Sequence, residues 1–239
     1  MESKIVCWNV NWAKPGSARG DELKRRIFRQ KPEIICISEG YCGYLEHAGH
    51  SIYSAADYGY AIVEGRRKVF LWSKMPWREI DEIGHPSMPT GRFVAGVTQT
   101  SIGDVRVVGL CIPWQMAHVS TGQKNRAPWE VHLTYLRGLK LYLASLKDNM
   151  PIILSGDFNQ RLPRGRQPWQ AYKLLAEMLA DQFDIWTVGE VKGLDRQPVC
   201  HIGGSKELAS RHVSGRTRMD QTGRQLTDHD GLVCRFMVA

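Results

Sequence analysis

Short apolar runs that end in carboxylate or carboxamide side chains constrain the fold of this chain more than any other feature. In the clearest case, residues 151–160, the run Ile152–Leu154 precedes a Ser-Gly pair, and Asp157 and Asn159 follow. Such a run is typical of a strand buried on both faces, and polar residues at alternating positions point to the same side. Their oxygens suit a divalent cation or the activation of a water molecule. The alternative is an Asx turn where the strand stops.

Three further strand-like runs meet polar residues in the same way. Asn9 and Asn11 follow the first run, Glu39 ends the second, and Asp228 with His229 precedes the last. One polar strand end is common because Asp and Asn favour turns, but four in one chain favour a shared site. Functional groups usually gather at the carboxyl ends of strands in α/β folds, so we expect these side chains to meet there.

The apolar periodicity predicts how helices and strands alternate. Helical spacing of apolar residues predicts helices over 21–30, 128–147 and 169–179. Short β-rich runs between Tyr53 and Ile112 predict an antiparallel meander. The runs of this meander are 60–63, 68–72, 93–98 and 105–112, and further strands are expected at 185–188, 198–202 and 231–238.

Length and composition limit the class of protein. The 239 residues contain no linker-like segment, so we expect a single domain over residues 1–239. No apolar run approaches the ~20 residues that span a bilayer and no secretory signal is recognisable, which predicts a soluble, cytoplasmic protein with no membrane partner. The lack of a coiled-coil pattern predicts a monomer. Six cysteines without a CxxC pair are expected to be free thiols, at positions 7, 36, 42, 111, 200 and 234.

The charge balance favours an anionic partner. Lys and Arg number 32 against 24 Asp and Glu, and the net charge is +8. Arg161 and Arg164 follow Asn159 in a loop rich in Pro and Gly, which predicts cations beside the proposed site. The other basic clusters are expected to be solvated surface, and they lie at 24–26, 66–68 and 211–218.

The segment between positions 114 and 129 contains a mixture of aromatic and basic residues. Trp114 and Arg126 are candidates for stacking on bases and for neutralising phosphates, which are the two contacts that single-stranded nucleic acid offers. Trp129 is equally consistent with simple packing at the start of the leucine-striped helix.

Together these motifs resemble the endonuclease/exonuclease/phosphatase superfamily, which includes DNase I-like and exonuclease III-like enzymes. The resemblance implies a four-layer α/β sandwich, with two mixed β-sheets packed face to face and helices on the outside. It also implies Mg²⁺-dependent, or Mn²⁺-dependent, cleavage of a phosphoester, with nucleic acid as the expected substrate. The motifs are Trp8-Asn9-Val10-Asn11, Ser38-Glu39, Ser155-Gly156-Asp157-Phe158-Asn159 and Thr227-Asp228-His229.

The resemblance also implies roles for the metal-binding and catalytic residues. Glu39 is similar to the principal metal ligand of the family, Asn9 to a group that helps to hold the metal or the phosphate, and Asp228 to a second acidic group near the metal. Asp157 resembles the residue that orients or deprotonates the attacking water. His229 resembles the group that stabilises negative charge at phosphorus.

Two amides complete the set that the resemblance implies. Asn159 is similar to the family's phosphate-contacting amide. Asn11 occupies a position where relatives carry Asp or Asn, and we place it among the substrate-binding residues together with Trp114, Arg126, Arg161 and Arg164.

The chain departs from the family pattern next to His229. Relatives commonly carry an Asp that fixes the catalytic His at the position where this chain has Cys200, and a thiol is a weaker partner for an imidazole. Asp195 and Asp230 are candidates to replace that Asp. The adjacent His201 lies in a strand-like run and is expected to be a hydrogen-bonded core residue.

Three functions remain open from the sequence. The first is a metal-dependent nuclease. The second is a phosphoesterase acting on a small molecule or lipid headgroup, for which we expect an exposed apolar loop that the sequence does not reveal. The third is a catalytically weakened nucleic-acid-binding module, favoured by Cys200. Residues 111–114 lack the Tyr and Asn of abasic-site endonucleases, which weakens that more specific assignment.

Overall fold

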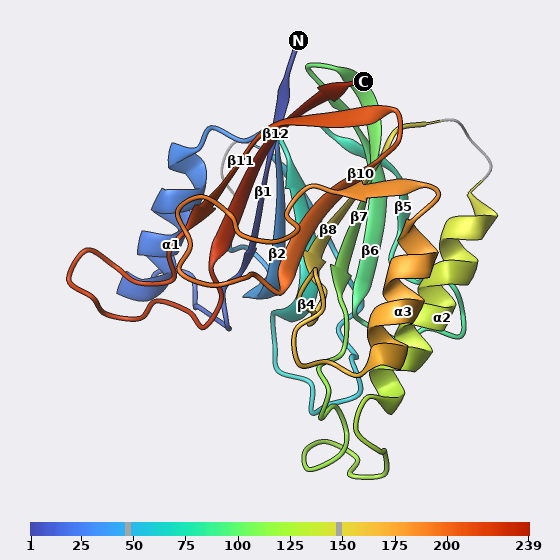
Figure 1. Ribbon diagram of the computed structural model, residues 1–239. Helices are drawn as coiled ribbons and strands as arrows, with labels where there is room; N and C mark the ends of the chain where they lie inside the picture. The colour runs from blue at the N-terminus through green and yellow to red at the C-terminus, as the bar shows by residue number, and fades with distance from the viewer. Residues whose placement is uncertain (46–48, 147–149) are drawn as a thin grey trace.

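The computed structural model describes residues 1–45, 49–146 and 150–239. Within these ranges the chain forms helices and strands in an order that begins and ends with a strand (Figure 1). The helices are α1 (Ala18–Arg29), α2 (Glu130–Ser145) and α3 (Trp169–Leu179). The strands are β1 (Ser3–Asn9), β2 (Ile34–Tyr41), β3 (His50–Tyr53), β4 (Arg66–Ser73), β5 (Trp77–Asp81), β6 (Phe93–Thr100), β7 (Gly103–Cys111), β8 (Ile152–Asp157), β9 (Phe183–Ile185), β10 (Cys200–Ser205), β11 (Leu208–Arg216) and β12 (Gly231–Val238).

The strands form two six-stranded sheets. Their orders are β11-β12-β1-β2-β4-β3 and β5-β6-β7-β8-β10-β9. Each sheet has one parallel pair near its centre, β1 with β2 and β7 with β8, and antiparallel pairs elsewhere. Both sheets are therefore mixed, as the family resemblance implied.

Three apolar layers hold the sheets and helices together. One fills the space between the sheets, where Ile5 and Cys7 of β1 meet residues such as Val107 and Ile153. The second lies between the β7–β8 side and helices α2 and α3, and the third lies between β1–β2 and α1. Figure 1 shows α1 on one side of the paired sheets and α2 with α3 on the other. The protein is thus an α/β sandwich of four layers, and this prediction is confirmed.

The alternation of side chains along β1 explains why the strand reads as continuously apolar. Ile5 and Cys7 face the layer between the sheets, whereas Val6 and Trp8 face α1. A strand with helices or a second sheet on each face buries both sets of side chains, so it lacks the polar positions of a half-exposed strand.

The predicted helices are confirmed, and residue 147 of the helix predicted over 128–147 lies outside the described residues, but two predicted strands are wrong. Of the strand predicted over 185–188, only Ile185 lies in β9, and residues 186–187 form a turn. Residues 60–63 lie in a loop, where Ile62 is 66% exposed and Val63 is 40% exposed. β-branched residues favour strands where they have a sheet face to pack against, and the side chains of Ile62 and Val63 are largely exposed instead. The expected meander also divides, because β4 pairs with β2 in one sheet while β5, β6 and β7 run antiparallel in the other.

The strand register brings the polar strand ends to one end of the molecule. Asn9 pairs with Ser38 in the parallel β1–β2 pair, so Asn9 and Glu39 are neighbours. Asp157 pairs with Cys111 on one side and with Cys200 on the other. This end lies opposite the chain termini, at the bottom of Figure 1.

Gly156 allows β8 to approach β7 closely just before Asp157. Its φ angle is +146°, and a Cβ atom there would lie 1.9 Å from the carbonyl oxygen of Leu110. Only glycine fits such a contact without movement of the backbone. The Ser-Gly pair that precedes Asp157 therefore positions the carboxylate as well as ending the apolar run.

Candidate functional site

Asp157 lies at the centre of the polar cluster. Its side chain is almost completely buried at the end of β8. Asp157 Oδ2 accepts a hydrogen bond from Asn9 Nδ2 at 3.0 Å, and His229 Nε2 lies 3.9 Å from the same oxygen. Asp157 Oδ1 accepts from the backbone N–H of Asn159 at 3.0 Å, which is the Asx turn considered from the sequence. Asp157 therefore forms an Asx turn and also belongs to the polar cluster, so the two interpretations of this motif are both correct.

The surroundings of Asp157 raise its pKa. Burial is the largest cause because it disfavours the charged carboxylate, and the negative charge of Glu39 acts in the same direction. His229 and the hydrogen bond from Asn9 oppose this shift. A carboxylate with a raised pKa is a stronger base than an ordinary Asp, which suits proton abstraction from water.

Asn9 joins β1 to the segment that precedes β12. Its Oδ1 accepts a hydrogen bond from the backbone N–H of Asn11 at 2.9 Å, and its carbonyl accepts from Thr227 Oγ1 at 2.8 Å. The Asn11 carbonyl in turn accepts from Arg19 at 2.8 Å. The amide of Asn9 is thus fixed on both sides while its Nδ2 holds Asp157.

His229 is held by Cys200 and by Trp8. Cys200 Sγ lies 3.4 Å from His229 Nδ1, and the indole N–H of Trp8 donates to the His229 carbonyl at 2.9 Å. Asp228 Oδ2 lies 3.9 Å from His229 Nε2, on a side chain that is more than half exposed. Nε2 therefore faces two carboxylates, those of Asp157 and Asp228.

Cys200 occupies the position of the missing Asp. The pKa of its thiol is raised, first by the neighbouring Cys7 and then by burial, so Cys200 stays protonated at neutral pH. The two acids considered as substitutes bind arginines instead: Asp195 pairs with Arg218, and Asp230 pairs with Arg218 and Arg196.

Glu39 lies beside this cluster and forms an ion pair with Lys68. Its backbone has a φ angle of 53°, and its Oε1 accepts a hydrogen bond from Lys68 Nζ at 2.6 Å. Lys68 belongs to the basic cluster at 66–68 that we expected to be solvated surface, and for Lys68 this prediction is wrong. No local sequence pattern indicates this pair, because Glu39 lies on β2 and Lys68 lies on β4.

The donor set suits a hard divalent cation. Glu39, Asp157 and Asp228 offer carboxylate oxygens and Asn9 offers an amide oxygen, which are the ligands that Mg²⁺ and Mn²⁺ take. Ligand atoms of Asp157, Cys200 and His229 also lie within 4.8 Å of one another. A protonated thiol is a poor metal ligand, so the oxygen set is the better candidate.

The remaining predicted site residues fall into two groups. Asn159 and Arg161 line a cavity of about 190 Å³ together with Cys200, Asp228 and His229. Asn159 Nδ2 donates to the Ile112 carbonyl at 2.8 Å, so its amide is tied to the segment after β7.

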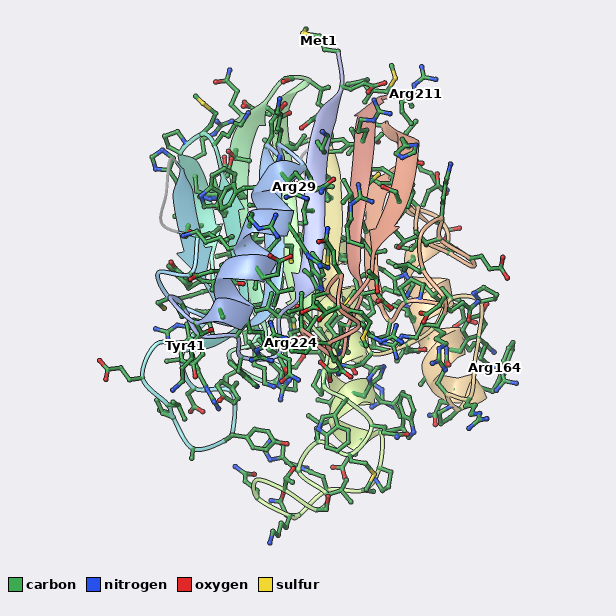
Figure 2. All side chains as sticks on the ribbon, turned by 90° about the vertical axis from the view of Figure 1, so that its left-hand side faces the viewer. Met1, Arg29, Tyr41, Arg164, Arg211 and Arg224 are labelled. Carbon is green, nitrogen blue, oxygen red and sulfur yellow. The ribbon has the colours of Figure 1, made fainter. Side chains whose placement is uncertain are left out.

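The other predicted cations lie outside that cavity. Arg164 donates to the Gln167 carbonyl and lies 6.0 Å from the ring centre of Trp169 at the start of α3. Figure 2 shows Arg164 and Tyr41 on opposite sides of the lower end of the molecule, and Arg211 at the other end. Arg126 pairs with Glu130 at 2.7 Å on the surface.

Trp114 and Trp129 take different positions. Trp114 lines a second cavity, of about 370 Å³, beside Lys68. Trp129 precedes α2 and packs edge-on against His132, with ring centres 4.9 Å apart, so the packing alternative holds for Trp129. His201 is a buried core residue that binds Thr187 and the carbonyl of Gln160, as expected.

Comparison with known proteins agrees with this geometry. A model of the endonuclease/exonuclease/phosphatase family matches residues 6–176, which is well over half of the chain. The chain belongs to this family. Its members are generally hydrolytic enzymes, nucleases and phosphatases, that typically use a divalent metal. A search of curated proteins gave no significant match.

Several solved structures share the fold of this family member at low sequence identity. A 3′-5′ exonuclease from Neisseria meningitidis matches with a TM-score of 0.70 and 14% identity over 98% of this chain and 99% of its own. An AP endonuclease from Archaeoglobus fulgidus matches with a TM-score of 0.65 and 17% identity over 97% and 98%. D. rerio TDP2 in complex with a single-strand DNA product matches with a TM-score of 0.66 and 13% identity over 98% of both chains. At these identities the likeness is one of fold.

Proposed function

We propose that this protein is a divalent-metal-dependent phosphodiester hydrolase, a nuclease that cleaves DNA or RNA with a water molecule activated by Asp157. The observation that carries the proposal is the buried Asp157 carboxylate, held by Asn9 and faced by His229 on the same oxygen. General-base catalysis by such a group contributes about 10²–10⁴-fold to a rate.

Asp157 and the residues around it have different roles in hydrolysis. Asp157 Oδ2 takes the proton of the attacking water. The contact of His229 Nδ1 with Cys200 Sγ holds the ring so that Nε2 faces the carboxylates. With a proton on Nε2, the ring donates to a phosphate oxygen as negative charge develops there. Asn159 and Arg161 line the same cavity and contact the phosphate.

Glu39, Asn9 and Asp228 would hold the metal. When bound, a divalent cation supplies positive charge to the phosphate and to the attacking oxygen. Lys68 balances the charge of Glu39 in the structure, as expected for a carboxylate that otherwise pairs with a metal.

Nucleic acid as the substrate is supported by charge and by the structural neighbours. The net charge of +8 favours a polyanion, and the similar proteins include an exonuclease, an AP endonuclease and a protein solved with a DNA product.

The experiment is nucleotide release from single- and double-stranded DNA and RNA, with Mg²⁺ or Mn²⁺, measured for the parent and for Asp157→Asn. We expect the variant to lose about 10²–10⁴-fold of the rate. Equal rates would show that the activity does not come from this site. No release from any of the four substrates would contradict the nuclease proposal.

A phosphoesterase acting on a lipid headgroup is the second candidate, because one observation favours it. Ile62 and Val63 form an exposed apolar segment at the rim of the cavity that Trp114 lines, a feature that the sequence did not reveal. Phosphoinositide and sphingomyelin vesicles belong in the same activity measurement. Hydrolysis of these lipids without nucleotide release would select this candidate.

A further inference from the structure

The cavity of about 370 Å³ beside Glu39 has an unusual lining, and we call it the Arg92 pocket. Its cations are Arg66, Lys68 and Arg92, and no carboxylate lines it among the residues that the structure describes. Its rings include Trp12, Tyr60 and Trp114. The volume falls in the range of small-ligand sites, roughly 300–1,000 Å³.

Arg92 is a buried cation whose guanidinium has no acceptor in the described parts of the chain. Only 3% of the residue is exposed. Its carbonyl accepts hydrogen bonds from Tyr135 and Cys111, but its side chain faces the pocket without an acid or a carbonyl partner. None of its nitrogens is among the buried polar atoms that lack a partner, so the guanidinium reaches the open space of the pocket. A guanidinium held there without an acidic partner is suited to bind an anion such as a phosphate.

The other two cations leave the pocket positively charged. Lys68 shares its charge with Glu39. Arg66 donates to the hydroxyl of Tyr41 at 3.0 Å and lies 4.7 Å from the ring centre of Trp12, so its charge is not neutralised by these contacts. A phosphate entering the pocket would therefore meet two cations that lack an acidic partner.

Among the aromatic residues that line the pocket, Trp114 has a ring face that no described aromatic side chain covers. Trp12 and Tyr60 are already stacked, on Tyr58 and His118 respectively. Trp114 is 42% exposed, and none of the described aromatic side chains stacks on its indole. An exposed indole beside unpaired cations is the combination that binds an unpaired base next to its phosphate.

The pocket adjoins the proposed metal site directly. The backbone N–H of Trp12 donates to the Glu39 carbonyl at 2.6 Å, and Lys68 bridges Glu39 and the pocket. A chain of nucleotides that places one phosphate at Asp157 and Glu39 would bring a neighbouring nucleotide to this pocket.

We propose that the Arg92 pocket binds the nucleotide next to the cleaved bond, with its phosphate on Arg92 and Arg66 and its unpaired base on Trp114. This inference rests on the proposed nuclease function and specifies its substrate: a single-stranded segment. A base in a duplex cannot stack on the indole, because both of its faces are covered by neighbouring bases.

The test is metal-free binding, in EDTA, of a 5′-phosphorylated pentathymidylate and of a blunt DNA hairpin, measured by calorimetry. We expect the parent to prefer the pentathymidylate, and Arg92→Met and Trp114→Ala each to weaken its binding about tenfold. Trp169→Ala is the matched control, since Trp169 is an exposed indole near Arg164 and outside the pocket, and should bind as the parent does. Trp114 is on the surface, so its variant should fold even if Arg92→Met does not, and circular dichroism checks both.

Three results would overturn the inference. If Trp114→Ala binds the pentathymidylate as tightly as the parent does, the pocket binds the phosphate but no base stacks on Trp114. Equal affinity for the hairpin would remove the preference for a single strand. Binding to anionic phospholipid vesicles but not to the oligonucleotide would select a lipid headgroup instead. Hydrolysis of bis(p-nitrophenyl) phosphate with Mn²⁺ by the parent tests the proposed function separately, because it requires the metal site and not the binding measurement.

Discussion

The contact between Cys200 and His229 determines how firmly the histidine ring is oriented. A carboxylate at position 200 would accept a hydrogen bond from Nδ1–H, whereas a protonated thiol can donate to Nδ1 or accept from Nδ1–H, and it does either weakly. The thiol therefore selects the ring tautomer less firmly than a carboxylate does. The hydrogen bond of a thiol is also weak, so we expect Cys200 to position His229 with a modest energetic contribution.

Cys200→Ala should lower kcat for nucleotide release about three- to tenfold, while Cys200→Ser should stay close to the parent. A hydroxyl can form a hydrogen bond with Nδ1 as the thiol does, and an alanine cannot, so the difference is about 1 kcal/mol, the usual net value of one hydrogen bond. Comparison of kcat with KM and of the pH profiles separates positioning from packing. A serine variant as slow as the alanine variant would show that Cys200 only fills space.

The ion pair between Lys68 and Glu39 predicts a competition with metal. Lys68→Gln should bind Mn²⁺ more tightly by about fivefold, roughly 1 kcal/mol, because Glu39 is released from its partner. Glu39→Gln should lose most of the affinity because it removes a carboxylate ligand. Calorimetric titration with Mn²⁺ measures both. Unchanged binding in Glu39→Gln would contradict the ligand assignment, and weaker binding in Lys68→Gln would contradict the competition.

At the scale of single elements, the sequence was informative wherever the apolar pattern was strong. The bounds of α3 agree with the predicted range, because a buried helical stripe depends only on local spacing. Strands β3, β5 and β11 were missed, since they are short or carry many polar residues and their pairing partners are distant in sequence. The run at 60–63 was misassigned because propensity says nothing about whether a packing surface exists.

The close approach of β8 to β7 at Gly156 gives an element-scale prediction. Gly156→Ala should destabilise the protein strongly, by about 4 kcal/mol or more, because the added Cβ meets the backbone of β7 at 1.9 Å and the φ angle is unfavourable for alanine. Urea unfolding followed by circular dichroism measures the loss. Gly103→Ala is the control, since Gly103 also has a positive φ angle but open space around it. A loss no larger than that of the control would show that backbone conformation alone matters.

At the scale of the whole molecule, the sequence predicted the layers and the end of the sandwich where polar residues meet. It did not predict the Arg92 pocket. Trp12, Lys68, Arg92 and Trp114 come from separate segments, and nothing local marks a buried arginine that lacks an acidic partner. The motif residues were recognisable because each follows an apolar strand, whereas the pocket depends on how the loops close over the sheets.

Two buried histidines connect distant elements through Gln160 and predict how the whole protein responds to acid. His132 on α2 lies 2.8 Å from Gln160 Nε2, and His201 on β10 lies 3.0 Å from the Gln160 carbonyl. Burial lowers the pKa of each to about 4, from an ordinary value of about 6.5.

At these two histidines the unfolded chain therefore binds more protons than the folded chain between pH 6.5 and 4, so they lower the free energy of unfolding as the pH falls through this range. The raised pKa of Asp157 acts in the opposite direction. Each histidine contributes on the order of 3 kcal/mol to that loss.

His132→Gln should flatten the decline by removing one of the two titrating groups, whereas His212→Gln, at an exposed position, should leave it unchanged. Urea unfolding in EDTA at pH 7, 5.5 and 4.5 measures the three slopes. If the parent and His132→Gln decline in parallel, His132 is charged in the folded protein, and its buried contacts to Pro113 and Gln160 must be compatible with an imidazolium.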